Sequence, residues 1–552
     1  MEREELQRFV AAEFGDPGSD LKTVLPPGWH EAAPTWVGEL PDPELRDLGA
    51  AVHGLWSSLC RQACSHTHPD RHTLLPLPHP FIVPGDRFRE CYNWDSYWII
   101  QGLLASELVP AAEALVRNLL HLVDVWGFVP NGARSYYTNR SQPPLLSAMV
   151  LSVWTAAADD RLLEDALPRL IKQHRYWTSG PKAVRIRPPP ANGCCAHPAG
   201  TGGADATIPN VVAPDAHDEV MLSRYYAEWC APRPESYRED AELVARAGLS
   251  GAEAEALYRD IASAAESGWD FSSRWMVGGD ALEYTRTTQV IPADLNAWLY
   301  RFERDIVAVA SHLGRPELAK AYGSQAEARL RAMDRLMWSE ADGCWHDLLL
   351  TQPQPGPRST SSRPTSEPAE AAGSSAAGAS GGSPGHIDEP TYAAEQRPGA
   401  YASNWVPLWC GCAERGSSRA AAAVSGLLRS GLIQPGGLST SLVRSGQQWD
   451  APNAWPPLVH MAVEALAEAG VPEGERAAAE LACCWVAAAQ VGWRTTGHMH
   501  EKYSAEELGG VGGGGEYAPQ VGFGWSNGVL LALMQRFCRR GGAAGGPGGG
   551  SA

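Results

Sequence analysis

The chain has 552 residues, of which 45 are basic and 63 acidic, and its net charge of −18 repels phosphate groups. This charge argues against a nucleic-acid partner or an anionic membrane surface and favours a neutral, polar ligand. Because no run of about 18 or more apolar residues occurs, we expect no membrane-spanning segment. The hydrophobic fraction of 44% suffices for a large core, and 21 tryptophans favour contacts with flat apolar surfaces such as sugar faces.

The N-terminus and the cysteines bear on the cellular compartment. Met1 to Leu6 is too acidic for a secretory signal peptide, so the chain as it stands predicts a cytoplasmic protein. A longer N-terminus with an export signal would make it extracellular instead. The 12 cysteines follow no regular disulfide framework. Cys60 and Cys64 lie near histidines, but their spacing matches no closed zinc site, and we expect no metal or other cofactor.

Helical periodicity dominates the chain, and strand alternation is scarce. Short connections join the predicted helices, which cover Leu6–Glu13, Leu45–Cys64, Trp98–Leu108, Ala111–Trp126, Leu145–Ala157, Leu162–Trp177, Asp218–Cys230, Ala252–Ser267, Asp294–Leu313, Pro316–Trp338, Arg419–Leu428, Ala454–Glu468, Gly474–Ala489 and Trp525–Phe537. Successive helical hairpins predict a closed or stacked all-α architecture whose polar loops gather at one mouth.

Two segments differ from the rest in composition. Gln352 to Glu389 is rich in Pro, Ser, Gly, Thr and Ala and has almost no large apolar side chains. Such a segment cannot bury enough surface to offset the entropy of ordering, which predicts a disordered insertion. Gly541 to Ala552 is a similar, glycine-rich tail. We therefore expect one domain over residues 1–540, interrupted by the insertion.

The stretch from Glu266 to Trp275 places one carboxylate, Asp270, among aromatic residues with an arginine close by. Desolvation raises the pKa of a carboxyl group, and a proton donor needs such a shift to stay protonated near neutral pH. The same pattern is also typical of a protein core, in which Asp270 caps a helix or accepts an indole N–H bond.

Other loops combine planar hydrogen-bonding groups with aromatic rings, as a site for sugar hydroxyls requires. They lie at Pro84–Tyr97, Gly127–Pro144 and Arg233–Asp240. The first is equally consistent with a helix-entry loop that has Asp95 near the N-cap. The glycine run from Gly509 to Tyr517 lacks the ending of a phosphate loop, which leaves a mobile loop over a ligand or a plain linker.

Two stretches of the chain, one of them among the loops above, resemble a known family. Pro84–Tyr97 and Gln448–Pro457 closely resemble the two signatures of the trehalases, glycoside hydrolase family 37, although Asp86 stands where a second glycine is usual. Family members usually carry more sequence ahead of the part resembled by Phe9 to Trp29. Further loops match in family order, namely Pro130–Gly132, Gln142–Pro144, Arg233–Tyr237, Ser267–Asp270, Met499–Tyr503, Gly512–Tyr517 and Gly522–Asn527.

The resemblance implies an all-α (α/α)6 toroid that hydrolyses α,α-trehalose to two glucose molecules with inversion at one anomeric carbon. It implies Asp270 as the general acid and Glu501 as the general base, the pair that inverting hydrolysis needs. It also implies a substrate-binding shell of Arg87, Trp94, Asp95, Asn131, Arg140, Gln142, Arg233, Glu235, Gly268 and Glu516. We therefore expect a trehalase-like catalytic domain that acts on trehalose as a monomer without a cofactor.

Two other classes of function stay open. The arginines of the site are also suited to phosphate, which leaves a phosphorylase or another glycosidase on the same scaffold, although the acidic residues beside them argue against it. A catalytically silent sugar sensor is the other class, and the presence of both carboxylates argues against that. Glucose release from trehalose without phosphate separates the three.

Overall fold

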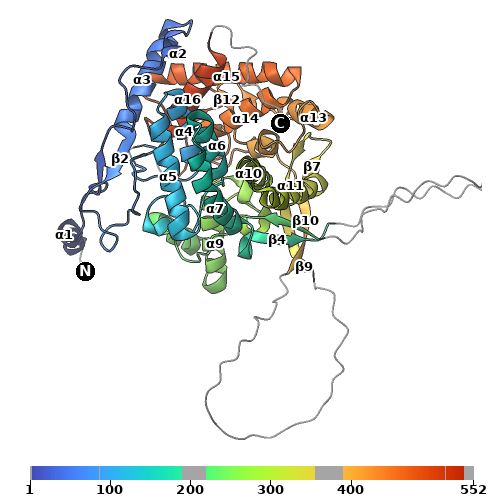
Figure 1. Cartoon of the computed structure of the whole chain (residues 1–552). Helices are drawn as coiled ribbons and strands as arrows, with labels where there is room; N and C mark the ends of the chain where they lie inside the picture. Colours follow the sequence, from blue (N-terminus) through green and yellow to red (C-terminus); the bar gives the residue numbers. More distant parts are fainter. Residues whose placement is uncertain (1–2, 86, 189–218, 355–389, 516–517, 540–552) are drawn as a thin grey trace, which may run out of the picture.

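An inner ring of helices organises the molecule. The structure, a computed structural model, describes residues 3–85, 87–188, 219–354, 390–515 and 518–539. Each inner helix contacts the next, and the last returns to the first (Figure 1). In order around the ring they are α4 (Asp95–Ala105), α6 (Leu146–Ala157), α10 (Ala293–His312), α12 (Val406–Trp409), α14 (Pro456–Glu468) and α16 (Gly524–Phe537).

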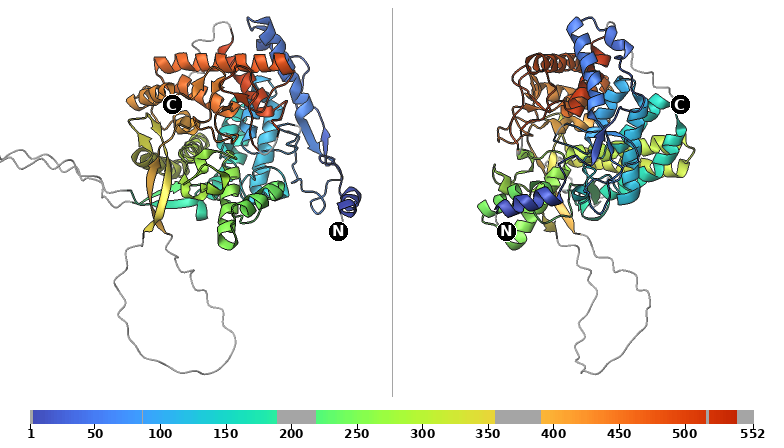
Figure 2. Two further views of the ribbon diagram at one scale, coloured as in Figure 1. Left: turned by 180° about the vertical axis from the view of Figure 1, so that it is seen from behind. Right: turned by 90° about the vertical axis from the view of Figure 1, so that its left-hand side faces the viewer.

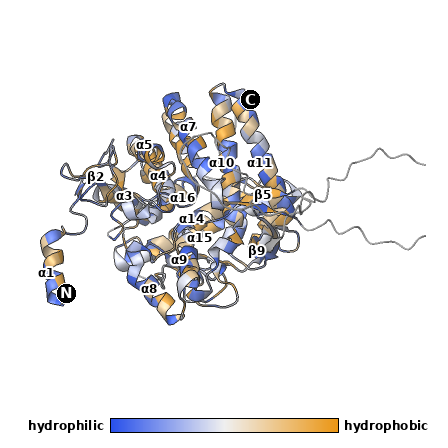
Figure 3. Ribbon diagram, turned by 90° about the horizontal axis from the view of Figure 1, so that it is seen from below, coloured by the Kyte–Doolittle hydropathy of each residue, from blue (hydrophilic) through white to orange (hydrophobic). Residues whose placement is uncertain are grey.

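A second layer of helices packs around this ring. Its members are α3 (Pro43–Leu59), α5 (Val109–Trp126), α7 (Asp160–Trp177), α11 (Pro316–Leu336), α13 (Ser418–Arg429) and α15 (Pro472–Thr496). In Figure 3, α4, α14 and α16 lie near the centre of the molecule, whereas α5, α7 and α11 lie nearer its edge. Inner and outer helices alternate along the chain, so the expected (α/α)6 toroid is confirmed.

The sequences of the helices explain which layer each one occupies. In α4, 9 of the 11 residues are buried, as expected for a helix that is apolar nearly all round. Where α4 meets α16, a Cβ on Gly102 would lie 2.4 Å from the Cα of Gly528. The two backbones therefore touch, and only glycine allows this approach.

The ends of the outer helices follow capping rules that are readable in the sequence. Asp42 accepts the backbone N–H of Glu44 at 2.9 Å, and Pro43 occupies the first turn of α3. Gly127 ends α5 with a φ of 88°, a left-handed conformation that favours glycine. Because such caps end the helices at defined residues, the chain can turn back toward the inner ring.

A five-stranded sheet lies beside the toroid, below α11 in Figure 1. Its order is β5 (Val220–Ser223), β4 (Ala183–Ile186), β10 (Thr391–Arg397), β9 (Asp347–Gln354) and β6 (Val290–Ile291). β10 pairs with β4 in parallel, and the other neighbours are antiparallel.

The remaining elements are short or peripheral. Figure 2 shows α1 apart from the toroid, and none of its side chains is buried. Within the described ranges, none of the helices has the length and apolar character needed to cross a bilayer. These elements are α1 (Arg3–Glu13), α2 (Thr35–Gly38), α8 (Tyr237–Arg246), α9 (Gly251–Glu266), β1 (Leu21–Thr23), β2 (Cys60–Ala63), β3 (Phe81–Ile82), β7 (Trp338–Ser339), β8 (Cys344–Trp345), β11 (Ile433–Gln434), β12 (Gly437–Leu438), β13 (Asn453–Ala454) and β14 (Tyr503–Ser504).

Several sequence predictions are wrong where strands form. The helix predicted at Asp218–Cys230 does not form in its described part: Val220–Ser223 is strand β5, which pairs with β4, and residues 224–230 are irregular. The helix predicted at Leu45–Cys64 ends at Leu59, because the next four residues pair with β1 and β3. The predicted loop Arg233–Asp240 runs into helix α8. Pairing between distant segments overrides local periodicity at the two strands.

The predicted insertion begins too early. β9 extends to Gln354, so the first residues assigned to Gln352–Glu389 belong to a strand paired with β10. The rest of that prediction falls on residues 355–389, and the predicted tail Gly541–Ala552 lies at the C-terminus. Both lie outside the described residues, as does Asp86.

Candidate active site

A cavity of about 610 Å³ opens where α4, α14 and α16 begin. Loops that are far apart in the sequence converge here: some enter helices of the inner ring, and the loop of Arg233 and Glu235 enters α8. Glu516 lies outside the described residues. The other predicted site residues all line this cavity, namely Arg87, Trp94, Asp95, Asn131, Arg140, Gln142, Arg233, Glu235, Gly268, Asp270 and Glu501.

Asp95 and Glu235 have opposite ionisation tendencies within this cavity. Burial raises the pKa of Asp95 to about 8, and the nearby negative charges of Glu501 and Asp270 contribute to the rise. Burial also acts to raise the pKa of Glu235, but the positive charges of Arg140 and Arg233 outweigh it and lower that pKa. At neutral pH the pocket therefore holds a protonated carboxyl at Asp95 and a carboxylate at Glu235.

Two arginines of the cavity, Arg140 and Arg233, form ion pairs with carboxylates. Arg140 forms an ion pair with Glu235, and its side chain is almost fully buried. Arg233 pairs with Asp240, whose carboxylate lies 2.7 Å from the guanidinium and also accepts the backbone N–H of Arg233 at 2.8 Å. Asp240 lies on α8, so the helix that was predicted as loop holds Arg233 at the cavity.

Asp450 forms hydrogen bonds with the loop that carries Asp270. This fully buried carboxylate accepts the Ser272 hydroxyl at 3.0 Å and the Ser273 backbone N–H at 2.7 Å. The backbone N–H of Trp449 donates to the carbonyl of Phe271 at 3.0 Å. The stretch with the second family signature therefore positions Asp270.

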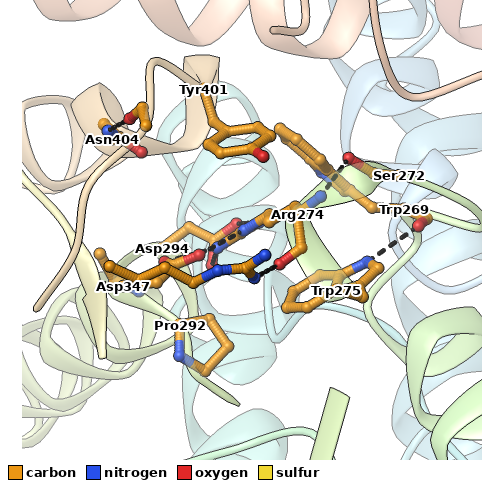
Figure 4. Close-up of polar contacts among 12 residues, drawn as sticks. Trp269, Ser272, Arg274, Trp275, Pro292, Asp294, Asp347, Tyr401 and Asn404 are labelled. Carbon is orange, nitrogen blue, oxygen red and sulfur yellow. Dashed lines mark hydrogen bonds and ion pairs between the residues drawn. The ribbon is translucent and has the colours of Figure 1, made fainter. Parts of the chain in front are cut away.

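Arg274 anchors the other end of the same loop (Figure 4). Its buried guanidinium lies 2.7 Å from a carboxylate oxygen of Asp294 and 2.7 Å from one of Asp347. The guanidinium carbon lies 4.8 Å from the ring centroid of Trp269 and 4.5 Å from that of Trp275. Moving this loop would expose or separate buried charges, so its position is rigidly determined.

Four tryptophans, Trp94, Trp449, Trp455 and Trp525, are among the residues that line the cavity. Trp449 and Trp455 stack with ring centroids 3.9 Å apart and an interplanar angle of 2°, and Trp94 lies 5.7 Å from Trp449. Flat aromatic surfaces suit the apolar faces of sugar rings. Neither Trp449 nor Trp455 was among the predicted site residues, although both belong to the second signature.

The glycine run, described from Gly509 to Gly515, contacts Asn453 and Gln448, although Gly513 to Gly515 are exposed. The backbone N–H of Gly513 donates to the side chain of Asn453 at 2.9 Å, and its carbonyl accepts from the same amide at 2.9 Å. A Cβ at Gly515 would lie 2.6 Å from Oε1 of Gln448. At Gly515 a larger side chain would collide with Gln448, while the predicted mobile loop or linker stays a prediction.

Comparisons with known proteins agree with this architecture. A family model described as Trehalase matches residues 1–538. The chain is 38% identical over 545 residues to a probable trehalase from Oryza sativa subsp. japonica, covering 97% of this chain and 86% of that one. It is 34% identical over 541 residues to a trehalase from Homo sapiens, covering 97% and 80%.

A solved structure supports the fold. The neutral trehalase from Saccharomyces cerevisiae aligns with a TM-score of 0.59 at 21% identity, covering 83% of this chain and 73% of that one. The relatives and the helical toroid define the protein as a glycoside hydrolase. Within this class, the chain belongs to the trehalase family, since the family match spans almost its whole length.

Proposed function

We propose that the protein hydrolyses α,α-trehalose to two glucose molecules with inversion at one anomeric carbon. The observation that carries this proposal is that Asp270 and Glu501, which lie far apart in the sequence, line one cavity in a member of the trehalase family. The arginines and tryptophans around them suit a neutral, hydroxyl-rich substrate.

In this mechanism Asp270 is the general acid and Glu501 the general base. Glu501 takes a proton from a water molecule, whose oxygen attacks the anomeric carbon from the face opposite to the leaving group. The glycosidic C–O bond breaks, and its oxygen takes the proton of Asp270. For this reaction the two carboxyl groups should be roughly 6.5 to 9.5 Å apart, which leaves room for the water.

The surroundings of Glu501 suit this assignment. One of its carboxylate oxygens accepts the backbone N–H of Gln520 at 3.2 Å, and its backbone carbonyl accepts the indole N–H of Trp525 at 2.8 Å. These contacts orient a side chain that is 1% exposed. A base held in one orientation can direct a water molecule toward one face of the sugar.

The remaining residues of the cavity would bind the sugar. We propose that Arg87, Arg140 and Arg233 donate to hydroxyl groups, and that Asn131 and Gln142 contribute amide contacts. Glu235 accepts from hydroxyls, and Asp95, protonated at neutral pH, donates to them. Trp94 packs against a ring face, and Gly268 makes room for that tryptophan. For Glu516 we also propose a role in binding the sugar.

The test is glucose release by the purified protein from trehalose and, as a control, from maltose, with and without phosphate. We expect phosphate-independent release from trehalose alone. NMR of the first turnovers should show equal amounts of α- and β-glucose, because only one of the two anomeric carbons is inverted. Phosphate-dependent turnover would instead indicate a phosphorylase, and binding without turnover a sensor.

Two further properties belong to this proposal. We propose that residues 1–540 act as one catalytic domain and that the protein is a monomer. Size-exclusion chromatography with light scattering should give the mass of one chain. A stable dimer, or a fragment of the toroid that hydrolyses trehalose alone, would contradict these two statements.

A further inference from the structure

Gln448 lies between the two loops that carry the proposed acid and base. Its side-chain amide donates to the backbone carbonyl of Asp270. Its Oε1 accepts from Nζ of Lys502 at 2.6 Å, and Lys502 directly follows Glu501 in the chain. One amide group therefore connects the peptide unit of Asp270 with the residue next to Glu501.

The chemistry of its two neighbours determines which way this amide points. The carbonyl of Asp270 can only accept a hydrogen bond, and the ammonium of Lys502 can only donate. Gln448 is 3% exposed, and its backbone carbonyl accepts from the side chains of Asn453 and Trp455, each at 2.9 Å. Gln448 is therefore fixed by hydrogen bonds of both its side chain and its main chain.

Lys502 brings a positive charge close to both proposed catalytic carboxyl groups. Its side chain is fully buried, and Nζ lies 4.9 Å from the ring centroid of Trp455. Burial lowers the pKa of Lys502, and the negative charges of Glu501 and Asp270 oppose this shift only in part. A positive charge that interacts with a carboxyl group favours its ionised form.

Other charged groups face the same carboxyls from other elements. Asp95, at the start of α4, interacts with both Glu501 and Asp270. Arg233 and Glu235 line the cavity from the loop before α8. Among the described residues, Glu501 and Asp270 are the charged groups that act most directly on Lys502.

We propose that Gln448 and Lys502 are positioning residues, which hold the loops of Asp270 and Glu501 at one separation and place a positive charge beside both carboxyl groups. This inference rests on the proposed function. It extends that function by assigning a role to Gln448, which also lines the cavity, and to Lys502, which is not among the lining residues.

The test compares Lys502→Met, Lys502→Arg and Gln448→Met with the wild type, with the exposed Lys172→Met as control. We expect Lys502→Met to lower kcat for trehalose at least about tenfold with a smaller change in KM. The acidic and basic limbs of its pH profile of kcat/KM should both shift to higher pH by about 1 unit, because loss of the positive charge raises the pKa of each carboxyl group. Lys502→Arg keeps the charge and should keep the wild-type limbs even if its rate is lower.

The outcomes separate this inference from the proposed function. A wild type that releases no glucose from trehalose refutes both. If the wild type is active and the Lys502→Met variant keeps the wild-type pH profile, the inference alone is refuted, whether or not the rate falls. The reason is that a purely structural role lowers activity without shifting the pH profile. If Lys502→Met does not fold, Gln448→Met decides: we expect a folded protein with lower kcat, and wild-type kcat would overturn the bridge.

Discussion

The carboxylate of Glu266 accepts the backbone N–H of Ser141 at 3.0 Å and thereby joins two loops of the cavity. Ser141 lies between Arg140 and Gln142, while Glu266 ends the helix that leads to Asp270. The same carboxylate lies 2.7 Å from Nζ of Lys182. One fully buried ion pair therefore stabilises the arrangement of two distant segments.

We first predict that Lys182→Met destabilises the protein by ~3–5 kcal/mol, because it leaves Glu266 as a buried charge without its cation. Urea unfolding of the variant and the wild type measures this difference. The double variant Lys182→Met/Glu266→Gln should recover part of the loss, since it removes both charges. Equal stability of the single variant and the wild type would show that Glu266 needs no cation.

The two proposed catalytic residues should be separable by their leaving-group dependence. Asp270→Asn and Glu501→Gln should each lower turnover of trehalose by roughly 10²-fold or more. With α-glucosyl fluoride, whose leaving group barely needs protonation, Asp270→Asn should recover much of its rate. Glu501→Gln should not, because water still needs a base. The reverse pattern would exchange the two roles, and full activity of both variants would place the chemistry elsewhere.

Gly268→Ala should lower both stability and turnover. Gly268 has a φ of 74°, and a Cβ there would lie 2.7 Å from a ring carbon of Trp94. Gly278→Ala is a matched control, because its φ is 84° but no atom lies within 4 Å of the added Cβ. We expect backbone strain of ~1–2 kcal/mol in the control and a larger loss in Gly268→Ala. Equal losses would mean that Trp94 moves aside freely.

Asp95 should make stability fall as pH rises. Its folded pKa is about 8, whereas an unfolded Asp has a pKa of about 3.9. Between these values the folded state binds the extra proton, so the free energy of unfolding decreases from about pH 4 to about pH 8. Asp95→Asn should therefore lose less stability than the wild type between about pH 5 and about pH 9, by ~1 kcal/mol or more in denaturant titrations. Parallel pH dependence of the two proteins would show that Asp95 is ionised in the folded state.

Residues 355–389 should be replaceable by a short turn. Gln354 of β9 pairs with Thr391 of β10, so a few residues can connect the strands. We expect unchanged turnover and a gain in stability of at most about 2 kcal/mol, because closing a shorter loop costs less entropy. A deletion that also removes Leu348, which is 1% exposed, should destabilise the protein. Loss of activity in the shorter replacement would show a role for the segment.

The sequence by itself predicted most of the long helices and the loops that supply the candidate site. Helical periodicity reports which face of a segment is buried, and this signal is local. It located α6 and α10 to within one residue at each end, whereas the helix predicted at Gly474–Ala489 continues to Thr496 in α15. The loops that resemble family signatures carry Asp270 and Glu501, and all the described site residues line one cavity.

Only the tertiary structure decided which distant groups meet. Asp294 and Asp347 had no sequence signal that linked them to Arg274, and the bridge from Asp270 through Gln448 to Lys502 joins three separate loops. Strand β5 also formed against a helical pattern because β4 lies beside it. The physical reason is that periodicity depends on neighbouring residues, whereas buried ion pairs and strand pairing depend on the path of the whole chain around the ring.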